Sequence, residues 1–581
     1  MNNSKKNKLT HSFSSENNQS RINFFSLGGQ DERGKNCYVL EIDNNIFIFN
    51  AGSLVPTTSL LGVKQLIPDF DWLVRNKNRI KGLFVGYPTQ ENLGSLENLL
   101  KDLGPIPIYT SLIGKAMIET LAEKKVQIIP SKLMKIIPVE NMKPIMVGNQ
   151  KIIPFKVCNS MPWSLGFAFD TKQGYILYID DFILYSDNNV AFESHLNDIA
   201  LMVHNKVFLL IVGVGYIGKN SGYTSPQHKS KPILEQIINE TQGRVFVACY
   251  DSNAYTLLTV AQLARQKSRP LIIYSHTFIN IFSTIIRNKI FNNRNLLTMP
   301  ISAIDKTDNA IVCVTSNPHR LYARLSKIAN GEDDKIHFQS TDSFVLVTPR
   351  VAGYEGVEAK ILDDIARNDV DYYRLTNDVL PMQASDEDHK YLLNLLKPKY
   401  VIPTSGLYND FIKYANVAKY TNISLDQIRI LYNGEIASFK DGVVQKHVKE
   451  IKLDAKYIDS SGVQDVGDSL LFEREQMAEN GVVIIVLFYN RKSREFLKDI
   501  KYEFYGITDE EEKMSTLYQK VDEQVRTLFK DLLSMKTKQN EKNIAVSEVK
   551  EFKQSIKKTV AKIFEKNIDK KPIVLPTIVD L

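Results

Sequence analysis

The sequence has few cysteines and no long apolar run. Only four of its 581 residues are cysteines, and none of them stands in a C-x-x-C pair. This scarcity excludes a disulfide framework and argues against a structural zinc knuckle. The longest apolar run, Val482–Tyr489, is too short to span a bilayer, and the first 20 residues lack the apolar core of a signal peptide. We therefore expect a cytoplasmic protein without a membrane segment, with a disordered polar and basic arm at residues 1–20.

An excess of one charge sign is also lacking over most of the chain. There are 73 lysines and arginines against 66 aspartates and glutamates, giving a formal net charge of +7. Between Lys530 and Pro572, however, 12 lysines accompany 6 acidic residues. A basic tail on a nearly neutral body fits contact with a polyanion such as RNA, although a solvated lysine-rich helix face is the more common meaning of such a run. Charge alone leaves both interpretations open.

Histidine is scarce in the arrangements that metal enzymes use. The chain has nine histidines but no H-x-H, H-E-x-x-H or H-x-x-x-H spacing. A dinuclear metal hydrolase needs several imidazoles and carboxylates converging on two ions. No local cluster of histidines supplies those imidazoles. We interpret the isolated histidines as surface or core residues: His195, His204, His276, His337 and His389.

Two glycine-rich segments come close to a phosphate-binding loop without completing it. Gly29–Lys35 and Gly213–Lys219 each follow a predicted strand, but Asn36 and Asn220 stand where the G-x-x-x-x-G-K-[ST] pattern places a hydroxyl for Mg²⁺. Neither segment leads into a predicted helix, whose first amides would hold the phosphate. The sequence therefore disfavours an NTPase.

The patterns that are present predict α/β layers. The length suggests three or four domains, and the composition, 43% hydrophobic and 24% charged, is that of a globular chain. Residues 21–206 show a β-rich layer with interspersed helices, and residues 207–372 alternate strand and helix as in a parallel βαβ sheet. Residues 373–450 return to strand and helix. Residues 451–581 show a linker, strands and two long amphipathic helices.

Several segments between Ile22 and Leu581 carry a family resemblance. They are FFSLGGQDERGKNCYVLEIDNNIFIFNAG, NRIKGLF, RLSKIANGEDDKI, LLNLLKPKYVIP, DVGD at Asp465–Asp468 and KKPIVLPTIVDL. On these segments the chain resembles bacterial ribonuclease J. That resemblance implies an α/β fold class: an αββα metallo-β-lactamase sandwich (21–206 and 373–450), an inserted β-CASP parallel α/β domain (207–372) and a small α/β C-terminal domain within 451–581.

The resemblance also locates the positions that hold two zinc ions in the family. The family segment T-H-x-H-x-D-H falls on residues 86–92, and the bridging aspartate is retained as Asp181. The other ligand positions have changed chemistry. They are Tyr87, Thr89 and Asn92 for three histidines, Glu91 for an aspartate, and Asn159 and Ser405 for two further histidines. Asn50 stands where the family has an aspartate before A-G.

The β-CASP motifs of the family are altered as well. Ser252 and Asn253 are kept, but the motif histidine after them falls on Tyr255. The histidine of the family's S-G-H-A segment falls on about Gln383, and its T-G-S-Q-G-E segment falls on residues 315–320. We regard Ser252, Asn253, Tyr255 and Gln383 as positions of residual RNA contact.

The residue types at the zinc positions argue against catalysis. Asn and Thr are poor neutral ligands, and a Tyr ligand must lose a proton whose ordinary pKa is about 10. Only Asp181 and Glu91 are plausible anionic ligands, enough for a weak Mg²⁺ or Mn²⁺ site at most. We therefore expect no catalytic residue, no bound metal and no other cofactor.

Three hypotheses about function follow. The leading one is a catalytically inactive ribonuclease J-like subunit in RNA processing and decay, which binds RNA, an active ribonuclease J paralogue or itself as a dimer or tetramer. The second is a metal-dependent 5′-to-3′ exoribonuclease or endoribonuclease with a divergent site built on Asp181 and Glu91. The third is a scaffold of an RNA-processing assembly, in which nucleic-acid contact is incidental.

Overall fold

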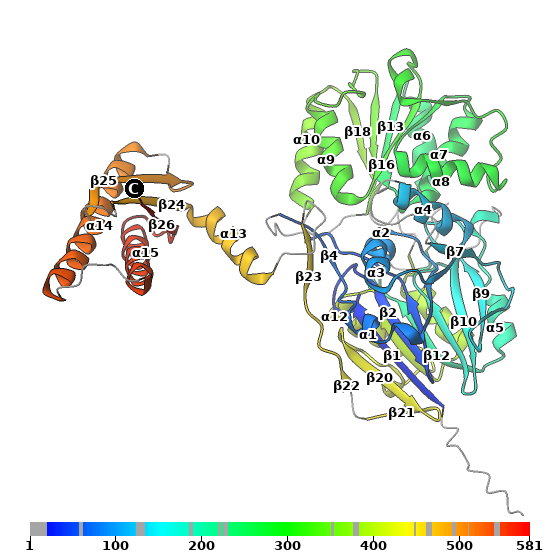
Figure 1. The fold of residues 1–581 in the computed structure, drawn as a ribbon. Helices are drawn as coiled ribbons and strands as arrows, with labels where there is room; N and C mark the ends of the chain where they lie inside the picture. The colour runs from blue at the N-terminus through cyan, green and yellow to red at the C-terminus, as the bar shows by residue number, and fades with distance from the viewer. Residues whose placement is uncertain are drawn as a thin grey trace, which may run out of the picture. The chain divides into compact units, whose positions relative to one another are not determined.

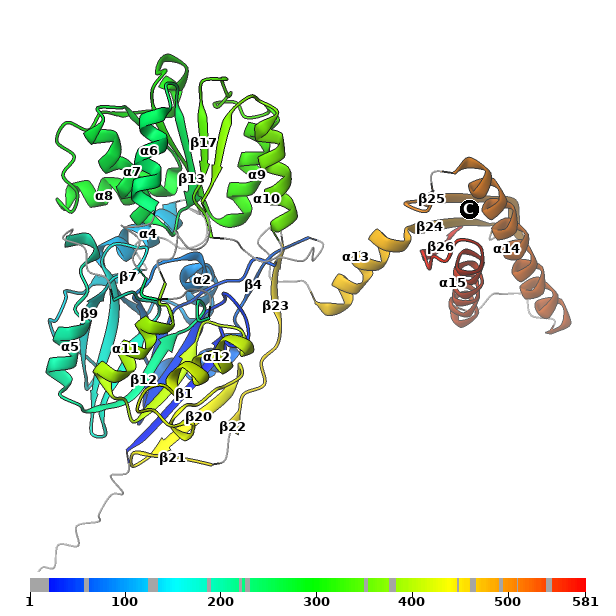
Figure 2. The same cartoon turned by 180° about the vertical axis from the view of Figure 1, so that it is seen from behind.

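The computed structural model describes residues 20–56, 62–123, 134–184, 190–218, 222–224, 230–349, 354–375, 383–446, 449–459, 467–490, 495–508, 510–539 and 546–580. The chain divides into two compact units, and apart from a short earlier segment the second unit begins at Tyr457. Figure 1 colours the chain from blue to red, and Figure 2 shows it from behind. The arm expected at residues 1–20 lies outside the described residues except for Ser20.

Two sheets pack face to face in the larger unit. The first runs in the order β21 (Val443–Val444), β20 (Glu435–Lys440), β1 (Arg21–Gly28), β2 (Cys37–Ile42), β3 (Asn45–Phe49), β5 (Ile80–Val85), β6 (Pro107–Thr110) and β7 (Lys135–Pro138), with β22 (Lys449–Glu450) paired to β20. The second runs in the order β19 (Tyr400–Thr404), β12 (Val207–Gly213), β11 (Gly174–Ile179), β10 (Ser164–Thr171), β9 (Gln150–Val157) and β8 (Ile145–Val147). Aromatic side chains fill the space between the two sheets, and the rings of Phe49 and Tyr178 stack across it at 3.9 Å.

Helices cover the outer face of each sheet, which completes an αββα sandwich (Figure 1). The helices over the first sheet are α1 (Asp71–Arg75), α2 (Gln90–Leu93) and α3 (Leu96–Leu103). Those over the second are α5 (Leu196–Val203), α11 (Asp386–Leu396) and α12 (Tyr408–Ala418). In β12, Leu210 and Val212 join the core under these helices, whereas Leu209 and Ile211 join the core between the sheets. The continuous apolar run of this strand follows from burial on both faces.

A separate sheet, parallel throughout, lies above the sandwich in Figure 1 and is drawn there mostly in green. Its strands are β15 (Thr298–Met299), β14 (Leu271–Tyr274), β16 (Ile311–Ser316), β13 (Val245–Tyr250), β17 (Ser343–Leu346) and β18 (Asp371–Arg374), in that spatial order. One face packs on α6 (Ser230–Glu240), α7 (Ala254–Gln266) and α8 (His276–Arg287), and the other on α9 (Pro318–Ala329) and α10 (Glu355–Ala366). This is the parallel α/β domain that the sequence predicts, and the expected fold class is confirmed.

The limits of this inserted domain differ from the sequence-based ones. Residue 207 was the expected start, but β12 pairs with β11 and β19 inside the sandwich. The expected end, residue 372, falls inside β18, which pairs with β17 of the inserted sheet. The first error arises because a buried parallel strand such as β12 looks the same in sequence whichever sheet it joins. The second is smaller, since β18 is a short, partly exposed strand that ends at Arg374.

The inserted domain shares part of its core with the sandwich. Ile113 and Met117 of α4 (Leu112–Glu123) belong to the same apolar cluster as the buried residues of α7 and α8. Met161 of the loop after β9 joins that cluster too. The two domains are therefore packed against each other through a common apolar contact.

The smaller unit contains a three-stranded sheet under two helices. β24 (Val482–Asn490) pairs antiparallel with β25 (Glu495–Tyr505) and parallel with β26 (Ile573–Asp580). Alternate residues of β24, from Val483 to Leu487, pack against α14 (Glu511–Gln539) and α15 (Val546–Ile568). α13 (Asp468–Asn480) lies outside this core. β4 (Val63–Ile67) and β23 (Lys456–Asp459) form a separate two-stranded sheet. The two long amphipathic helices predicted for the tail are therefore confirmed.

Among the described residues, no helix is long and apolar enough to cross a membrane. All four cysteines are described, buried and free of disulfide bonds.

Candidate functional site: the former metal positions

Strand ends from both sheets meet at the former metal positions. Asn50 follows β3 and Tyr87 follows β5, which run parallel in the first sheet. Asp181 follows β11 and Ser405 follows β19, which run parallel to β12 in the second sheet. Parallel strands present their carboxyl ends at one edge, so the fold brings these distant residues into one region, as the resemblance implies.

A buried hydrogen-bond network occupies the centre of this region. The side-chain nitrogen of Asn50 donates to Asp180 Oδ1 at 2.6 Å, to the Tyr178 hydroxyl at 2.9 Å and, at 3.1 Å, to Oδ1 of Asn92. Asn92 Oδ1 also accepts from Asn36 Nδ2 at 2.7 Å, and Asn92 Nδ2 donates to the carbonyl of residue 87. Amides therefore hydrogen-bond to one another, to Tyr178 and to Asp180 in the region where the family holds metal ions.

Asp180 was missed by the sequence interpretation, which singled out its neighbour. Burial raises the pKa of the Asp180 carboxyl to about 6, while hydrogen bonds from Tyr178, Asn50 and the backbone of Tyr87 oppose that shift. Its Oδ2 atom has no hydrogen-bond partner among the described residues, and neither has Oδ1 of Asn50. β11 is buried without alternation from Ile176 to Ile179, so its sequence pattern does not show which of the two following acids faces the network.

Asp181 lies in a second, separate network. Its Oδ1 accepts from the backbone N–H of Phe182 at 3.0 Å, and Gln383 and Ala384 also donate to the carboxylate. Burial raises the pKa of Asp181 to about 7 despite these donors. Asn159 is fully buried and donates to the carbonyl of residue 181 at 3.1 Å. Gln383, predicted as an RNA contact, is thus held by an internal carboxylate.

Tyr87 connects the sandwich to the inserted domain. Its hydroxyl lies 2.5 Å from Ser160 Oγ, which donates to the carbonyl of Ser252 at 2.7 Å. The backbone N–H of Tyr255 donates in turn to the carbonyl of Ser160 at 3.0 Å. Burial, followed by the nearby Asp181 charge, raises the pKa of Tyr87 well above its usual range. A phenol held neutral in this way is a hydrogen-bonding link and a poor metal ligand.

The side chains at the other former ligand positions have separate surroundings. Thr89 is buried at the N-cap of the short α2, and Glu91 in that helix is exposed. Ser405 adopts a left-handed backbone with φ of 57°, and its hydroxyl lies 2.9 Å from that of Tyr38. Asn253 caps α7 by accepting from Thr256, so it too has a structural bond. The structure brings Asn50, Asn92 and Asp180 together by hydrogen bonds and leaves the Glu91 side chain exposed.

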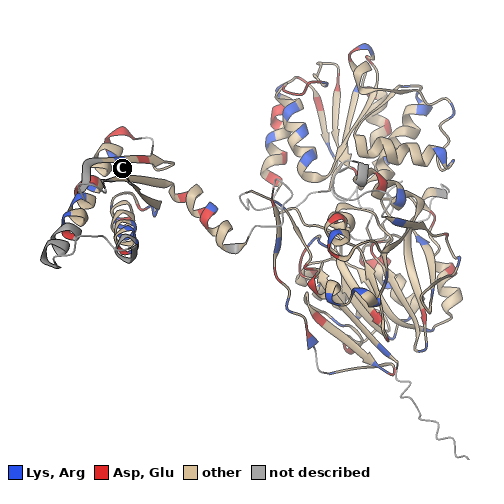
Figure 3. Cartoon of the chain, in the orientation of Figure 1, with Lys and Arg blue, Asp and Glu red and all other residues tan. Residues whose placement is uncertain are grey.

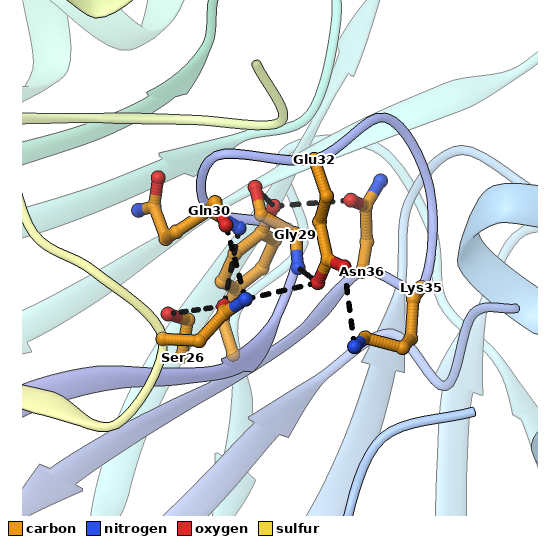
Figure 4. A network of polar contacts seen from close by, with 8 residues as sticks. Ser26, Gly29, Gln30, Glu32, Lys35 and Asn36 are labelled. Atoms are coloured by element: carbon orange, nitrogen blue, oxygen red, sulfur yellow. Dashed lines mark hydrogen bonds and ion pairs between the residues drawn. The ribbon is translucent and has the colours of Figure 1, made fainter. Parts of the chain in front are cut away.

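The loop from Gly29 to Asn36 is closed by a carboxylate (Figure 4). Glu32 accepts from the Gly29 N–H at 2.8 Å and from Asn433 at 3.0 Å, and its other oxygen pairs with the Lys35 ammonium at 3.1 Å. The amide and the cation that a phosphate would need are both engaged. Gly29, with φ of 95°, has no room for a side chain because a Cβ would lie 2.4 Å from the Tyr38 hydroxyl. The loop is a rigid turn, consistent with the prediction against an NTPase.

The donor atoms around these positions do not fit a pair of zinc ions. Within the described ranges, no group of three or more His, Cys, Asp or Glu side chains is placed to hold a metal ion. The seven former ligand positions contain no imidazole, and the amides of Asn92 and Asn159 are engaged in hydrogen bonds. Zinc sites use imidazole, thiolate and carboxylate donors, and these positions do not supply the set that zinc-dependent hydrolysis requires.

An αββα sandwich interrupted by a parallel-sheet domain defines a metallo-β-lactamase fold with a β-CASP insertion. Models of two named domains match the chain: "Ribonuclease J, beta-CASP domain" over residues 242–365 and "Ribonuclease J C-terminal domain" over residues 469–581. Ribonuclease J 2 of Staphylococcus epidermidis is 25% identical, covering 96% of this chain and 98% of the relative. Ribonuclease J2 of Bacillus subtilis is 24% identical, with 97% and 99% covered. The chain belongs to the ribonuclease J family.

Two relatives are much more similar in sequence. "Uncharacterized protein MG423" of Mycoplasma genitalium is 48% identical and its homologue in Mycoplasma pneumoniae 47% identical, each match covering 97% of this chain and 100% of the relative. Among solved structures, a protein of unknown function from Enterococcus faecalis has a TM-score of 0.50 at 14% identity, covering 72% of this chain and 100% of that one. That likeness concerns the fold alone.

Proposed function

We propose that this chain is a non-catalytic ribonuclease J-like subunit that binds RNA, an active ribonuclease J paralogue or a second copy of itself. It would act in the cytoplasm, in RNA processing and decay. One observation carries the proposal: side chains at and beside the former ligand positions are engaged in internal hydrogen bonds. Asn50, Asn92 and Asp180 form one network, and Asn159, Asp181 and Gln383 form another.

The last helix supports a role in RNA binding. Phe552, Ile556, Val560 and Phe564 of α15 are buried against the sheet, which leaves the opposite side of the helix to solvent. Exposed lysines on that side take part in no ion pair among the described residues; they are Lys557, Lys558, Lys562 and Lys566. Figure 3 shows basic residues along α15. Uncompensated cations on a rigid helix favour contact with a polyanion over a merely solvated face.

The test of the catalytic part combines a nuclease assay with metal analysis. The purified full-length chain is incubated with 5′-monophosphorylated RNA in separate Zn²⁺, Mn²⁺ and Mg²⁺ buffers, and its metal content is measured by mass spectrometry. We expect no cleavage and less than stoichiometric metal. Cleavage that the Asp181→Ala variant abolishes and the Lys335→Ala variant keeps would contradict the proposal and favour the divergent enzyme.

The test of the binding part uses salt dependence. Reversing charge in the triple variant Lys557→Glu, Lys558→Glu and Lys562→Glu should weaken RNA binding. It should also reduce the slope of log affinity against log salt by about 2, since each contact to a single strand contributes about 0.7. The control reverses three exposed lysines elsewhere: Lys206, Lys289 and Lys335. Equal losses in both variants would indicate a net-charge effect and argue against α15 as the contact.

A further inference from the structure

A surface hollow of about 550 Å³ lies on the sandwich domain, outside the former metal positions. α1 and the turn after it form one side, and β22 with the residues after it form the other. Its polar and aromatic lining comprises Trp72, Arg75, Asn76, Lys449, Glu450 and Lys452, and two isoleucines complete it. The volume is within the usual range for small-ligand sites.

The hollow carries an uncompensated positive charge. Arg75, Lys449 and Lys452 supply three cations, and Glu450 is the one acid in the lining. Among the residues that the structure describes, none of these three cations forms an ion pair. All three are exposed at the rim, so their charge is available to an anionic ligand.

Trp72 gives the hollow a fixed aromatic surface. Its ring packs edge-on against Phe25 with centroids 4.8 Å apart at 77°, and Asn76 donates to its carbonyl at 2.8 Å. The side chain is half-buried, so part of the indole borders the hollow. An aromatic side chain held in place beside several cations is the combination by which proteins bind single-stranded nucleic acid, stacking bases and pairing with phosphates.

We infer that this hollow binds a nucleoside phosphate unit of single-stranded RNA. The base lies against Trp72, and the phosphates pair with Arg75, Lys449 and Lys452. This site rests on the proposed function, because RNA is the ligand, and it adds a specific place on the sandwich that is separate from α15. An acidic peptide matches the cations but provides no flat ring for Trp72, so RNA is the better fit.

Tryptophan fluorescence tests the inference directly, because the chain has only two tryptophans. In the Trp163→Phe variant of the full chain, Trp72 is the single reporter. Titration with oligouridylate should quench its emission, and added salt should reverse the quenching. If that variant does not fold, the difference between the wild type and Trp72→Phe gives the same readout.

Charge reversal in the hollow provides the second measurement. Arg75→Glu combined with Lys452→Glu should weaken oligouridylate binding about tenfold or more and abolish the quenching. The matched control combines Lys77→Glu with Lys335→Glu, two exposed lysines outside the lining, and should bind nearly as the wild type does. The four charge changes can be checked for folding by circular dichroism.

The outcomes separate this site from the proposed function. RNA binding that depends on α15 and leaves the Trp72 fluorescence unchanged would overturn the binding site in the hollow but not the proposed function. If no method detects RNA binding, both the RNA site in the hollow and the RNA-binding part of the proposed function are overturned. Quenching by free AMP but not by oligouridylate would assign the hollow to a free nucleotide, and equal quenching by polyglutamate would show that only charge is recognised; either result overturns the inference.

Discussion

Asn50 Nδ2 donates a hydrogen bond of 2.6 Å to Oδ1 of Asp180, joining the ends of β3 and β11 across the two sheets. The hydroxyl of Tyr178 donates to the same oxygen. A buried carboxylate needs such donors because water no longer reaches it. In this chain an amide and a phenol thus stabilise the carboxylate in the region where the family places metal ions.

Restoring an acid at residue 50 should therefore destabilise the protein. In the Asn50→Asp variant two buried carboxyls meet without a donor between them, which should lower the free energy of unfolding by roughly 3 kcal/mol at pH 8. The loss should shrink at pH 4, where both groups become protonated. Urea denaturation at the two pH values measures this, with Asn45→Asp at the partly exposed start of β3 as the control. An equal loss in both variants would contradict the expected effect.

Removing the charge of Asp180 should have the opposite effect. Its folded pKa of about 6 lies above the ordinary value of 3.8, so the folded state binds the proton more tightly and stability falls as the pH rises from about 4 to about 6. The Asp180→Asn variant keeps an oxygen that accepts from Asn50 and Tyr178. Because its side chain does not ionise, its stability should not fall in this way as the pH rises. It should gain up to roughly 3 kcal/mol over the wild type above pH 6 and nothing near pH 4. A gain independent of pH would exclude the ionisation of Asp180 as its cause.

Most of the fold was predictable from the sequence because apolar periodicity and family segments record it. The tail helices repeat apolar residues at helical spacing, as in Val521 and Val525 of α14, and both formed as expected. The limits of the inserted domain were not predictable in the same way. β12 and β13 are both buried apolar runs, and only their pairing shows that one belongs to the sandwich and the other to the inserted sheet.

The site was predictable in position but not in its bonding. The resemblance placed Asn92, Asn159 and Asp181 in one region, where the structure has them. It could not show that Asn50 hydrogen-bonds to Asp180 whereas Gln383 hydrogen-bonds to Asp181. Adjacent residues at a strand end point to different sides, and the resemblance does not say which partner each side meets. Glu91 was a candidate ligand by type, but the structure leaves its side chain exposed.

The hydroxyl of Tyr87 should stabilise the contact between the sandwich and the inserted domain. The Tyr87→Phe variant keeps the ring and removes the bond to Ser160, which itself bonds to Ser252. The expected loss in the free energy of unfolding is about 1 kcal/mol, the usual net value of one hydrogen bond. Hydrogen exchange should accelerate at residues 252–255 and not in α15. The matched control is Tyr109→Phe, whose hydroxyl has no hydrogen-bond partner among the described residues. A loss of the same size there would show that the effect of the Tyr87 bond is not specific.

His389 should make the protein sensitive to mild acid. Its ring is buried between Phe182 and Tyr414, at 5.2 and 5.1 Å between centroids, and burial lowers its pKa from 6.5 to about 3. The unfolded chain therefore binds a proton that the folded protein excludes, so the contribution of His389 to stability is complete above pH 6.5 and is lost as the pH falls toward 3. Between pH 7.5 and pH 5.5 the wild type should lose about 1.4 kcal/mol relative to His389→Leu. The comparison uses urea denaturation at several pH values, with His337→Leu as the matched control. Parallel curves for wild type and His389→Leu across this range would show that His389 is not the titrating group.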